Sequence, residues 1–118
     1  MPNKPENTAI TAGRDSSRSL APALWPNTVW ESESLTDATR RATGLRSETF
    51  YSRFSNPTVT QFEDAIATLE GAESALAFGS GMGAISSVIL AFCSQGSHIV
   101  AQNNIYGATL SFLQGPCQ

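Results

Sequence analysis

The absence of charge from the second part of this chain most constrains what it can fold into. All ten acidic and all seven basic residues lie at or before Glu73, so the segment from Ser74 to Gln118 contains no Asp, Glu, Lys or Arg. Elements at the surface of a free-standing domain normally carry charge on their wet face. We therefore expect this segment to be covered, either by a membrane or by the rest of a larger fold.

A membrane span does not fit the residues. The stretch 75–93 is interrupted by Gly79, Gly81 and Gly83, and its strongly apolar part, residues 85–93, is too short to cross a bilayer. No Lys or Arg flanks it to set an orientation. The sequence therefore predicts no membrane partner and favours burial within a larger fold.

A strand, a glycine-rich turn and a helix are predicted at the start of this uncharged segment. Residues 75–78 read as a buried strand, residues 79–84 (Gly-Ser-Gly-Met-Gly-Ala) as the turn, and residues 85–92 as a helix. The first N–H groups of a helix lack intrahelical partners, and glycines let the backbone approach a phosphate closely. We predict that this turn holds the phosphate of a cofactor.

A second strand is predicted over residues 97–101, after Gly96 ends the helix. A strand–helix–strand unit implies parallel strands with a right-handed crossover, and parallel strands are buried on both faces. Another helix is expected to start within residues 105–109, at the sheet edge where ligands bind. This places Tyr106 near the glycine turn.

The first half of the chain predicts two helices and an extended arm. Asn56 and Pro57 begin a helix that runs to Glu70 and ends at Gly71, with an apolar face made by Val59, Phe62, Ile66 and Leu69. Ser34 or Thr36 caps a shorter helix over 37–42, which Gly44 ends. Residues 1–20 are expected to form a flexible polar arm, and residues 28–30 an edge strand or extended arm.

Tyr51 and Arg53 lie two residues apart, which puts both side chains on the same side of an extended segment. Two interpretations remain open. The pair forms a phosphate clamp, or Arg53 is a surface arginine stacked on an aromatic ring. Spacing alone favours the stacked arginine.

Other ligand classes fit less well. Residues 79–84 match G-x-G-x-x-A, but a dinucleotide site needs an acidic residue after the second strand, where Gln102 stands, and no acid follows it. No Lys follows the glycines as a P-loop requires. The net charge of −3 gives no basic surface for nucleic acid, and Cys93 and Cys117 form neither a disulfide framework nor a metal-ligand pattern.

Taken together, the ordered motifs resemble a known family. They are Tyr51-Ser52-Arg53 with Asn56-Pro57-Thr58, Leu69-Glu70-Gly71-Ala72, Ser80-Gly81-Met82 with Ala84-Ile85, and Tyr106-Gly107 with Thr109. This set is similar to the N-terminal portion of the Cys/Met-metabolism enzymes that depend on pyridoxal 5′-phosphate, which include cystathionine γ-synthase, cystathionine γ-lyase and homoserine-ester sulfhydrylases. The resemblance covers roughly residues 20–113.

The resemblance implies a cofactor site and a fold. Ser80, Gly81 and Met82 would bind the phosphate, Tyr106 would stack on the pyridine ring, and Tyr51 and Arg53 would reach the phosphate of a neighbouring subunit. The fold would be α/β, the N-terminal part of a fold-type I transferase with an incomplete parallel sheet and flanking helices. An arm over residues 1–56 would precede the beginning of the cofactor-binding domain over residues 57–118.

The implied activity is elimination or replacement at Cγ or Cβ of cysteine, cystathionine or homoserine esters, in a cytoplasmic homodimer or homotetramer. The family's chemistry uses a Schiff base between cofactor and a lysine, but the only lysine here is Lys4, in the polar tail. We therefore expect a fragment with no catalytic residue of its own and no lyase or synthase activity. Two alternatives stay open, a non-catalytic remnant or association module and a Rossmann-like nucleotide-binding domain.

Overall fold

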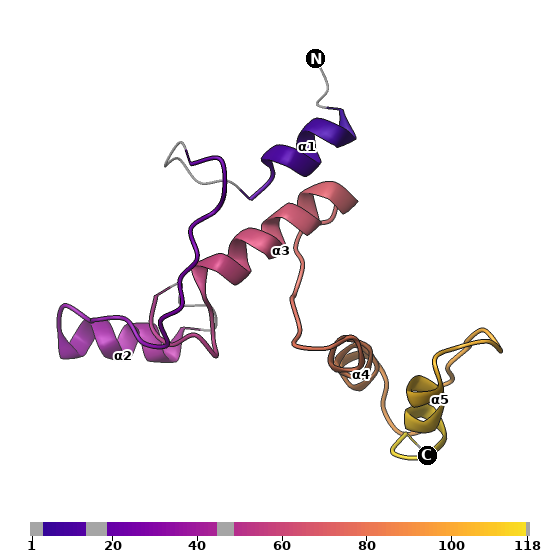
Figure 1. The fold of residues 1–118 in the computed structure, drawn as a ribbon. Helices are drawn as coiled ribbons and strands as arrows, with labels where there is room; N and C mark the ends of the chain where they lie inside the picture. The colour runs from indigo at the N-terminus through magenta and orange to yellow at the C-terminus, as the bar shows by residue number, and fades with distance from the viewer. Residues whose placement is uncertain (1–3, 14–18, 45–48, 118) are drawn as a thin grey trace. The chain divides into compact units, whose positions relative to one another are not determined.

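The computed structural model describes residues 4–13, 19–44 and 49–117, and the chain divides into two compact units, Met1–Leu76 and Ala77–Gln118. Within the described residues, the first unit contains helices α1 (Pro5–Thr11), α2 (Leu35–Thr43) and α3 (Pro57–Glu70), and the second contains α4 (Gly81–Phe92) and α5 (Gly107–Gln114) (Figure 1). The predicted domain boundary between residues 56 and 57 stays a prediction.

Helix α1 corrects the expectation of an arm without regular structure over residues 1–20. Pro5 occupies the start of the helix and Glu6 lies in its first turn. Proline has the helical φ angle built in, and an acidic residue there interacts favourably with the helix dipole. The short polar sequence shows no apolar period, and in the structure the helix also packs on α3. Residues 1–3 and 14–18 of the predicted arm lie outside the described residues.

The start and end signals of α2 and α3 are confirmed. Of the two candidate caps of α2, Ser34 accepts from the Asp37 backbone N–H at 3.1 Å, and the helix ends at Gly44. Asn56 caps α3 by accepting from the Thr58 N–H at 2.9 Å. Gly71 ends α3 with φ of 64°, the left-handed conformation that glycine adopts without a steric penalty.

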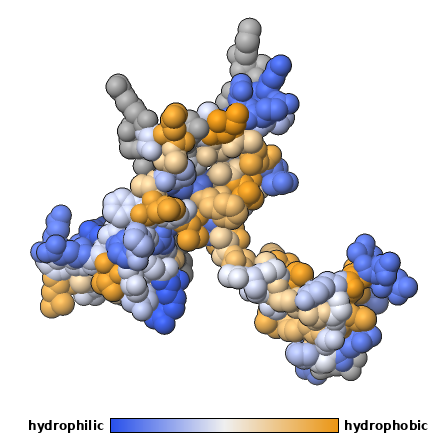
Figure 2. All heavy atoms as spheres, in the orientation of Figure 1, coloured by the Kyte–Doolittle hydropathy of each residue, from blue (hydrophilic) through white to orange (hydrophobic). Residues whose placement is uncertain are grey.

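The apolar stripe of α3 is exposed rather than covered. Phe62 is 58% exposed, and Val59, Ile66 and Leu69 are also exposed. Among the described residues only Ala67 and Glu63 are buried, on a neighbouring stripe of the same helix. Figure 2 shows apolar surface over parts of both units. Periodicity correctly predicts the helix, but the first unit does not use this stripe as its core.

Glycine at position 13 lets the chain pass close to α3. Gly13 has φ of 75°, and a Cβ built on it would collide with the Gln61 carbonyl oxygen and lie 3.2 Å from the Ala65 Cβ. A residue with a side chain would therefore be strained in its backbone and blocked by α3. This contact and the packing of α1 on α3 fix the N-terminal segment onto the helix.

The predicted parallel sheet is not confirmed. Residues 75–78 and 97–101 form no strand, and the one β-pairing in the described part of the chain is an isolated antiparallel bridge between Val29 and Tyr51. A parallel strand needs a neighbour to pair its N–H and C=O groups. Local sequence supplies apolar β-prone residues but not that neighbour.

The Val29–Tyr51 bridge joins the arm to the segment that precedes α3. The Trp30 N–H donates to the Phe50 carbonyl at 3.2 Å, and the Ser52 N–H donates to the Thr28 carbonyl at 2.8 Å. Residues 28–30 are therefore an arm that pairs with Tyr51, one of the two alternatives that the sequence left open.

None of the helices in the described ranges has both the length and the hydropathy of a bilayer-spanning segment. The apolar α4 is a helix of 12 residues that begins at Gly81, so two of the glycines predicted as a turn lie in its first turn.

Candidate functional site

The N-terminus of α4 carries two backbone donors that have no partner in the part of the chain that the structure describes. The Ser80 hydroxyl oxygen accepts from the Gly83 N–H at 3.0 Å, and the Ser80 carbonyl accepts from the Ala84 N–H at 3.1 Å. The N–H groups of Gly81 and Met82 come before these positions and have no hydrogen-bond partner among the described residues. These two donors and the positive end of the helix dipole can bind an oxyanion.

Space is open beside these donors. A Cβ built on Gly79 or on Gly81 would meet no heavy atom within 4 Å. At Gly83 a Cβ would lie 3.2 Å from the Ser80 Oγ, so this glycine faces the capping side chain instead. Gly81 is exposed and Met82 half-buried. A phosphate can therefore reach the Gly81 and Met82 amides from outside, without displacing a side chain.

The first turn of α5 contacts the first turn of α4. The Thr109 hydroxyl donates to the Met82 sulfur with 3.4 Å between oxygen and sulfur. Tyr106 immediately precedes α5 as its N-cap residue, and its side chain is 70% exposed. The second unit thus places the start of α5, which follows Tyr106, against the glycine-rich start of α4. The exposed Tyr106 ring is available to cover a ligand.

Tyr51 and Arg53 lie in the other unit and in a turn, not in an extended segment. The Phe54 N–H donates to the Tyr51 carbonyl at 2.9 Å, which closes the turn. The geometric premise for placing both side chains on one side is therefore wrong. The guanidinium carbon of Arg53 nevertheless lies 5.2 Å from the Tyr51 ring centroid. Within this chain the stacked arginine, favoured by spacing, is what the structure shows.

Hydrogen bonds from the arm hold this turn at the start of α3. The Asn56 side-chain amide donates to the Trp25 carbonyl at 3.0 Å. The Thr58 hydroxyl accepts from the Trp25 N–H at 2.9 Å and donates to the Ala23 carbonyl at 3.2 Å. Ser52 donates to the Asn27 carbonyl at 2.6 Å. From the sequence Asn56 is expected only to cap α3, and the signal for its second role is the set of polar side chains around Pro57.

Helix α2 carries a compact charge cluster with a structural role. The Asp37 carboxylate pairs with Arg40 at 2.7 Å and with Arg41 at 2.8 Å. The hydrogen bond from Arg41, and then the one from Arg40, lower the pKa of Asp37 from 3.8 to about 2. Arg41 also donates to the Thr49 carbonyl at 2.8 Å, which ties α2 to the residues just before Tyr51.

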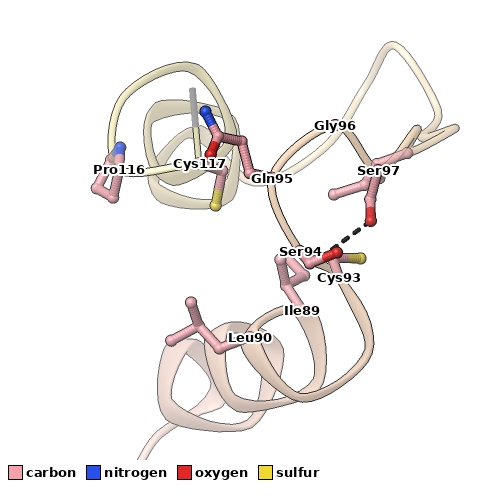
Figure 3. Close-up of a pocket in the computed structure, with 10 residues that line it drawn as sticks. Ile89, Leu90, Cys93, Ser94, Gln95, Gly96, Ser97, Pro116 and Cys117 are labelled. Atoms are coloured by element: carbon pink, nitrogen blue, oxygen red, sulfur yellow. Dashed lines mark hydrogen bonds between the residues drawn. The ribbon is translucent and has the colours of Figure 1, made fainter.

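A cavity of about 310 Å³ lies at the opposite end of α4. It is lined by the end of that helix, the turn at residues 94–97, and the tail at Pro116 and Cys117 (Figure 3). Ile89 is eight residues beyond Gly81, or about 12 Å along a helix. Cys93 and Cys117 both line this cavity and both are free thiols. The cavity is therefore separate from the oxyanion donors. The described residues contain no group of His, Cys, Asp and Glu arranged for a metal.

Comparison with known proteins assigns the chain to a family. The model of the Cys/Met metabolism PLP-dependent enzymes matches residues 6–117, so the chain belongs to this family. This confirms the resemblance seen in the ordered motifs and identifies pyridoxal 5′-phosphate as the family's cofactor. The charge-free segment is accordingly part of a family match that extends over nearly the whole chain.

Individual relatives agree with this assignment. The chain is 40% identical over 89 residues to the O-succinylhomoserine sulfhydrylase of Pseudomonas aeruginosa, covering 75% of this chain and 22% of that protein. It is 38% identical over 94 residues to the L-methionine gamma-lyase of Porphyromonas gingivalis, covering 80% of this chain and 24% of that protein. The chain thus spans about a quarter of the length of these curated relatives.

A solved structure shows the same fold. It is a putative O-acetylhomoserine (thiol)-lyase from Campylobacter jejuni, which carries N′-pyridoxyl-lysine-5′-monophosphate at its position 205. The TM-score is 0.81 at 28% identity, covering 95% of this chain and 28% of that one. The family part of the fold prediction is therefore confirmed, whereas the incomplete parallel sheet is not.

Proposed function

We propose that this chain supplies part of the cofactor site of a pyridoxal-phosphate-dependent enzyme of sulfur amino-acid metabolism. The observation that carries the proposal is the pair of unpartnered N–H groups at Gly81 and Met82. They lie at a helix N-terminus beside open space, which suits the dianionic phosphate of the cofactor. Family membership favours pyridoxal phosphate over other phosphorylated ligands.

The residues have distinct proposed tasks. Gly81 and Met82 donate hydrogen bonds to phosphate oxygens, while Ser80 keeps the helix start in shape by capping Gly83. Tyr106 covers the pyridine ring with its exposed ring. Tyr51 and Arg53 bind the phosphate held by a neighbouring subunit, so that the site is shared within a homodimer or homotetramer. When bound, the cofactor supplies an electron sink for carbanions of the substrate.

The proposed reaction class is elimination or replacement at Cγ or Cβ of cysteine, cystathionine or a homoserine ester. Relatives named as a sulfhydrylase and a gamma-lyase support this class and leave the substrate of this protein open. Covalent attachment of the cofactor needs a lysine amine. The only lysine of this sequence is Lys4, the N-cap residue of α1 in the other unit. We propose that the 118-residue chain by itself is inactive and lies in the cytoplasm.

A role as an association module is the second candidate. The exposed apolar stripe of α3 and the uncharged second unit favour it, because exposed apolar patches mark surfaces that bind another protein. Sedimentation of the chain with and without a full-length relative tests it. Co-sedimentation without any cofactor binding would favour the module over the cofactor site.

The cofactor proposal is tested by removing one donor without harming the helix. Gly81→Pro deletes the N–H at the first helical position, where proline is well tolerated, and Gly81→Ala keeps it. The probe is pyridoxine 5′-phosphate, whose alcohol cannot react with the Lys4 amine, followed by NMR at the Met82 amide. We expect Gly81→Pro to weaken binding roughly 10- to 100-fold, the effect of losing one hydrogen bond to a charged group. Equal affinity of the two variants would contradict the proposal.

A further inference from the structure

Three side chains form one cluster in the turn before α3. The Arg53 guanidinium carbon lies 5.2 Å from the Tyr51 ring centroid and 5.5 Å from the Phe54 ring centroid. The two rings meet edge to face, with centroids 6.4 Å apart and an interplanar angle of 61°. Arg53 is therefore within cation–π distance of two rings at once.

Arg53 differs in its partners from the arginines of α2. Arg40 and Arg41 both pair with the Asp37 carboxylate. In the described part of the chain Arg53 pairs with no carboxylate, and its guanidinium makes no hydrogen bond. Among the described residues its five N–H donors thus have no partner and can bind an incoming anion, while the guanidinium lies within cation–π distance of two rings.

Phe54 has no core to fill at this position. Its side chain is 51% exposed, and the turn is closed by its backbone N–H rather than by its ring. Replacing an exposed phenylalanine costs the fold little stability unless the contacts of its ring matter. Its ring meets the Tyr51 ring and lies within cation–π distance of Arg53.

We propose that Phe54 is a positioning residue that holds the Arg53 guanidinium against Tyr51, with its N–H donors directed to a phosphate oxyanion. The inference rests on the proposed function, in which Arg53 binds the cofactor phosphate, and it adds a residue that the family motif did not supply. Two ring contacts restrict the rotamers of a long flexible side chain, so less side-chain entropy is lost when the anion binds.

NMR of the labelled full chain tests the positioning. Protons of Arg53 beside ring faces are shifted upfield by the ring currents. We expect Phe54→Leu to move the Arg53 side-chain signals toward their random-coil positions and Phe54→Tyr to restore them. Phe62→Leu, at an exposed site on α3, is the control and should leave them unchanged. The Asn56 side-chain amide, which donates to Trp25, reports whether the turn stays folded.

Titration with inorganic phosphate and with pyridoxine 5′-phosphate supplies the second readout. Arg53 signals should respond with an affinity that falls about two- to fivefold in Phe54→Leu, the size of an exposed cation–π contact, and recovers in Phe54→Tyr. Unchanged Arg53 shifts or unchanged affinity in Phe54→Leu would overturn the inference. A response at the Gly81 and Met82 amides with none at Arg53 would overturn it while leaving the proposed cofactor site standing. If neither the Gly81 and Met82 amides nor Arg53 responded, both the positioning role of Phe54 and the proposed cofactor site would be overturned.

Discussion

Thr109 on α5 donates its hydroxyl hydrogen to the sulfur of Met82 on α4, across 3.4 Å. Met82 is the second residue of its helix and Thr109 the third of its own. The contact therefore joins the two helix N-termini at the candidate site. One residue of the pair supplies a proposed phosphate donor through its backbone, and the other follows Tyr106 within the same helical turn.

Thr109→Val tests this junction. Valine keeps the shape of threonine and removes the donor, so we expect a small destabilisation of the α4–α5 contact, about 0.5–1 kcal/mol. The Met82 methyl chemical shift and hydrogen exchange of the α5 amides provide the measurement. Thr109→Ser, which keeps the hydroxyl, serves as the control. An unmoved Met82 methyl signal in the valine variant would show that the contact has no role.

Asn56 is predicted to have two separable roles. Asn56→Ala removes the cap of α3 and the donor to Trp25, and should cost about 1 kcal/mol through the cap. Asn56→Asp keeps the cap but replaces the amide that donates to the Trp25 carbonyl. We expect the aspartate variant to retain α3 by circular dichroism while Trp25 fluorescence changes. Identical fluorescence in both the wild type and Asn56→Asp would argue against anchoring of the arm.

Gly13→Ala should release the N-terminal segment from α3. The substitution adds backbone strain at φ of 75° and a collision with the Gln61 carbonyl oxygen. Gly71→Ala is the matched control, because φ there is 64° and nothing lies within 4 Å of a Cβ. We expect backbone strain to destabilise both variants by about 1–2 kcal/mol. Only Gly13→Ala should lose protection from hydrogen exchange in α1. Equal α1 protection in the two variants would contradict the close approach.

The stability of helix α2 should fall at acid pH because Asp37 becomes protonated. The pKa of this carboxyl is lowered from 3.8 to about 2 in the folded chain. Because the pKa is lowered, the stabilisation by ionised Asp37 is fully present above pH 3.8 and is lost as the pH falls toward 2. Titration of the Asp37 carboxyl signal by NMR measures the value. Arg41→Gln removes the larger cause and should raise the pKa toward 3.8, and high salt should act in the same direction. A midpoint near 3.8 in the unaltered chain would refute the cluster.

The helix starts and ends were predictable because their signals are local. Ser34, Asn56 and Ser80 each bond to an N–H within three residues, and Gly71 ends α3 through its own backbone angle. Such contacts form between neighbours in the sequence, so the local residues are enough to predict them. The glycine-rich stretch that holds the candidate anion site was predictable in the same way, but the sequence predicts the start of α4 four residues late, at Ile85, because Ser80 reads as part of the turn and not as the cap.

Tertiary structure alone decided the long-range relationships. Residues 75–78 and 97–101 are apolar enough for strands, but pairing needs a neighbouring strand that local sequence does not supply. Helix α1 packs on α3, and the turn closed between Tyr51 and Phe54 places the Arg53 guanidinium carbon within 5.5 Å of both ring centroids. The apolar stripe of α3 was visible in the sequence, whereas its exposure was not. Burial depends on which other surfaces are present, and a helical period records only the side that can be buried.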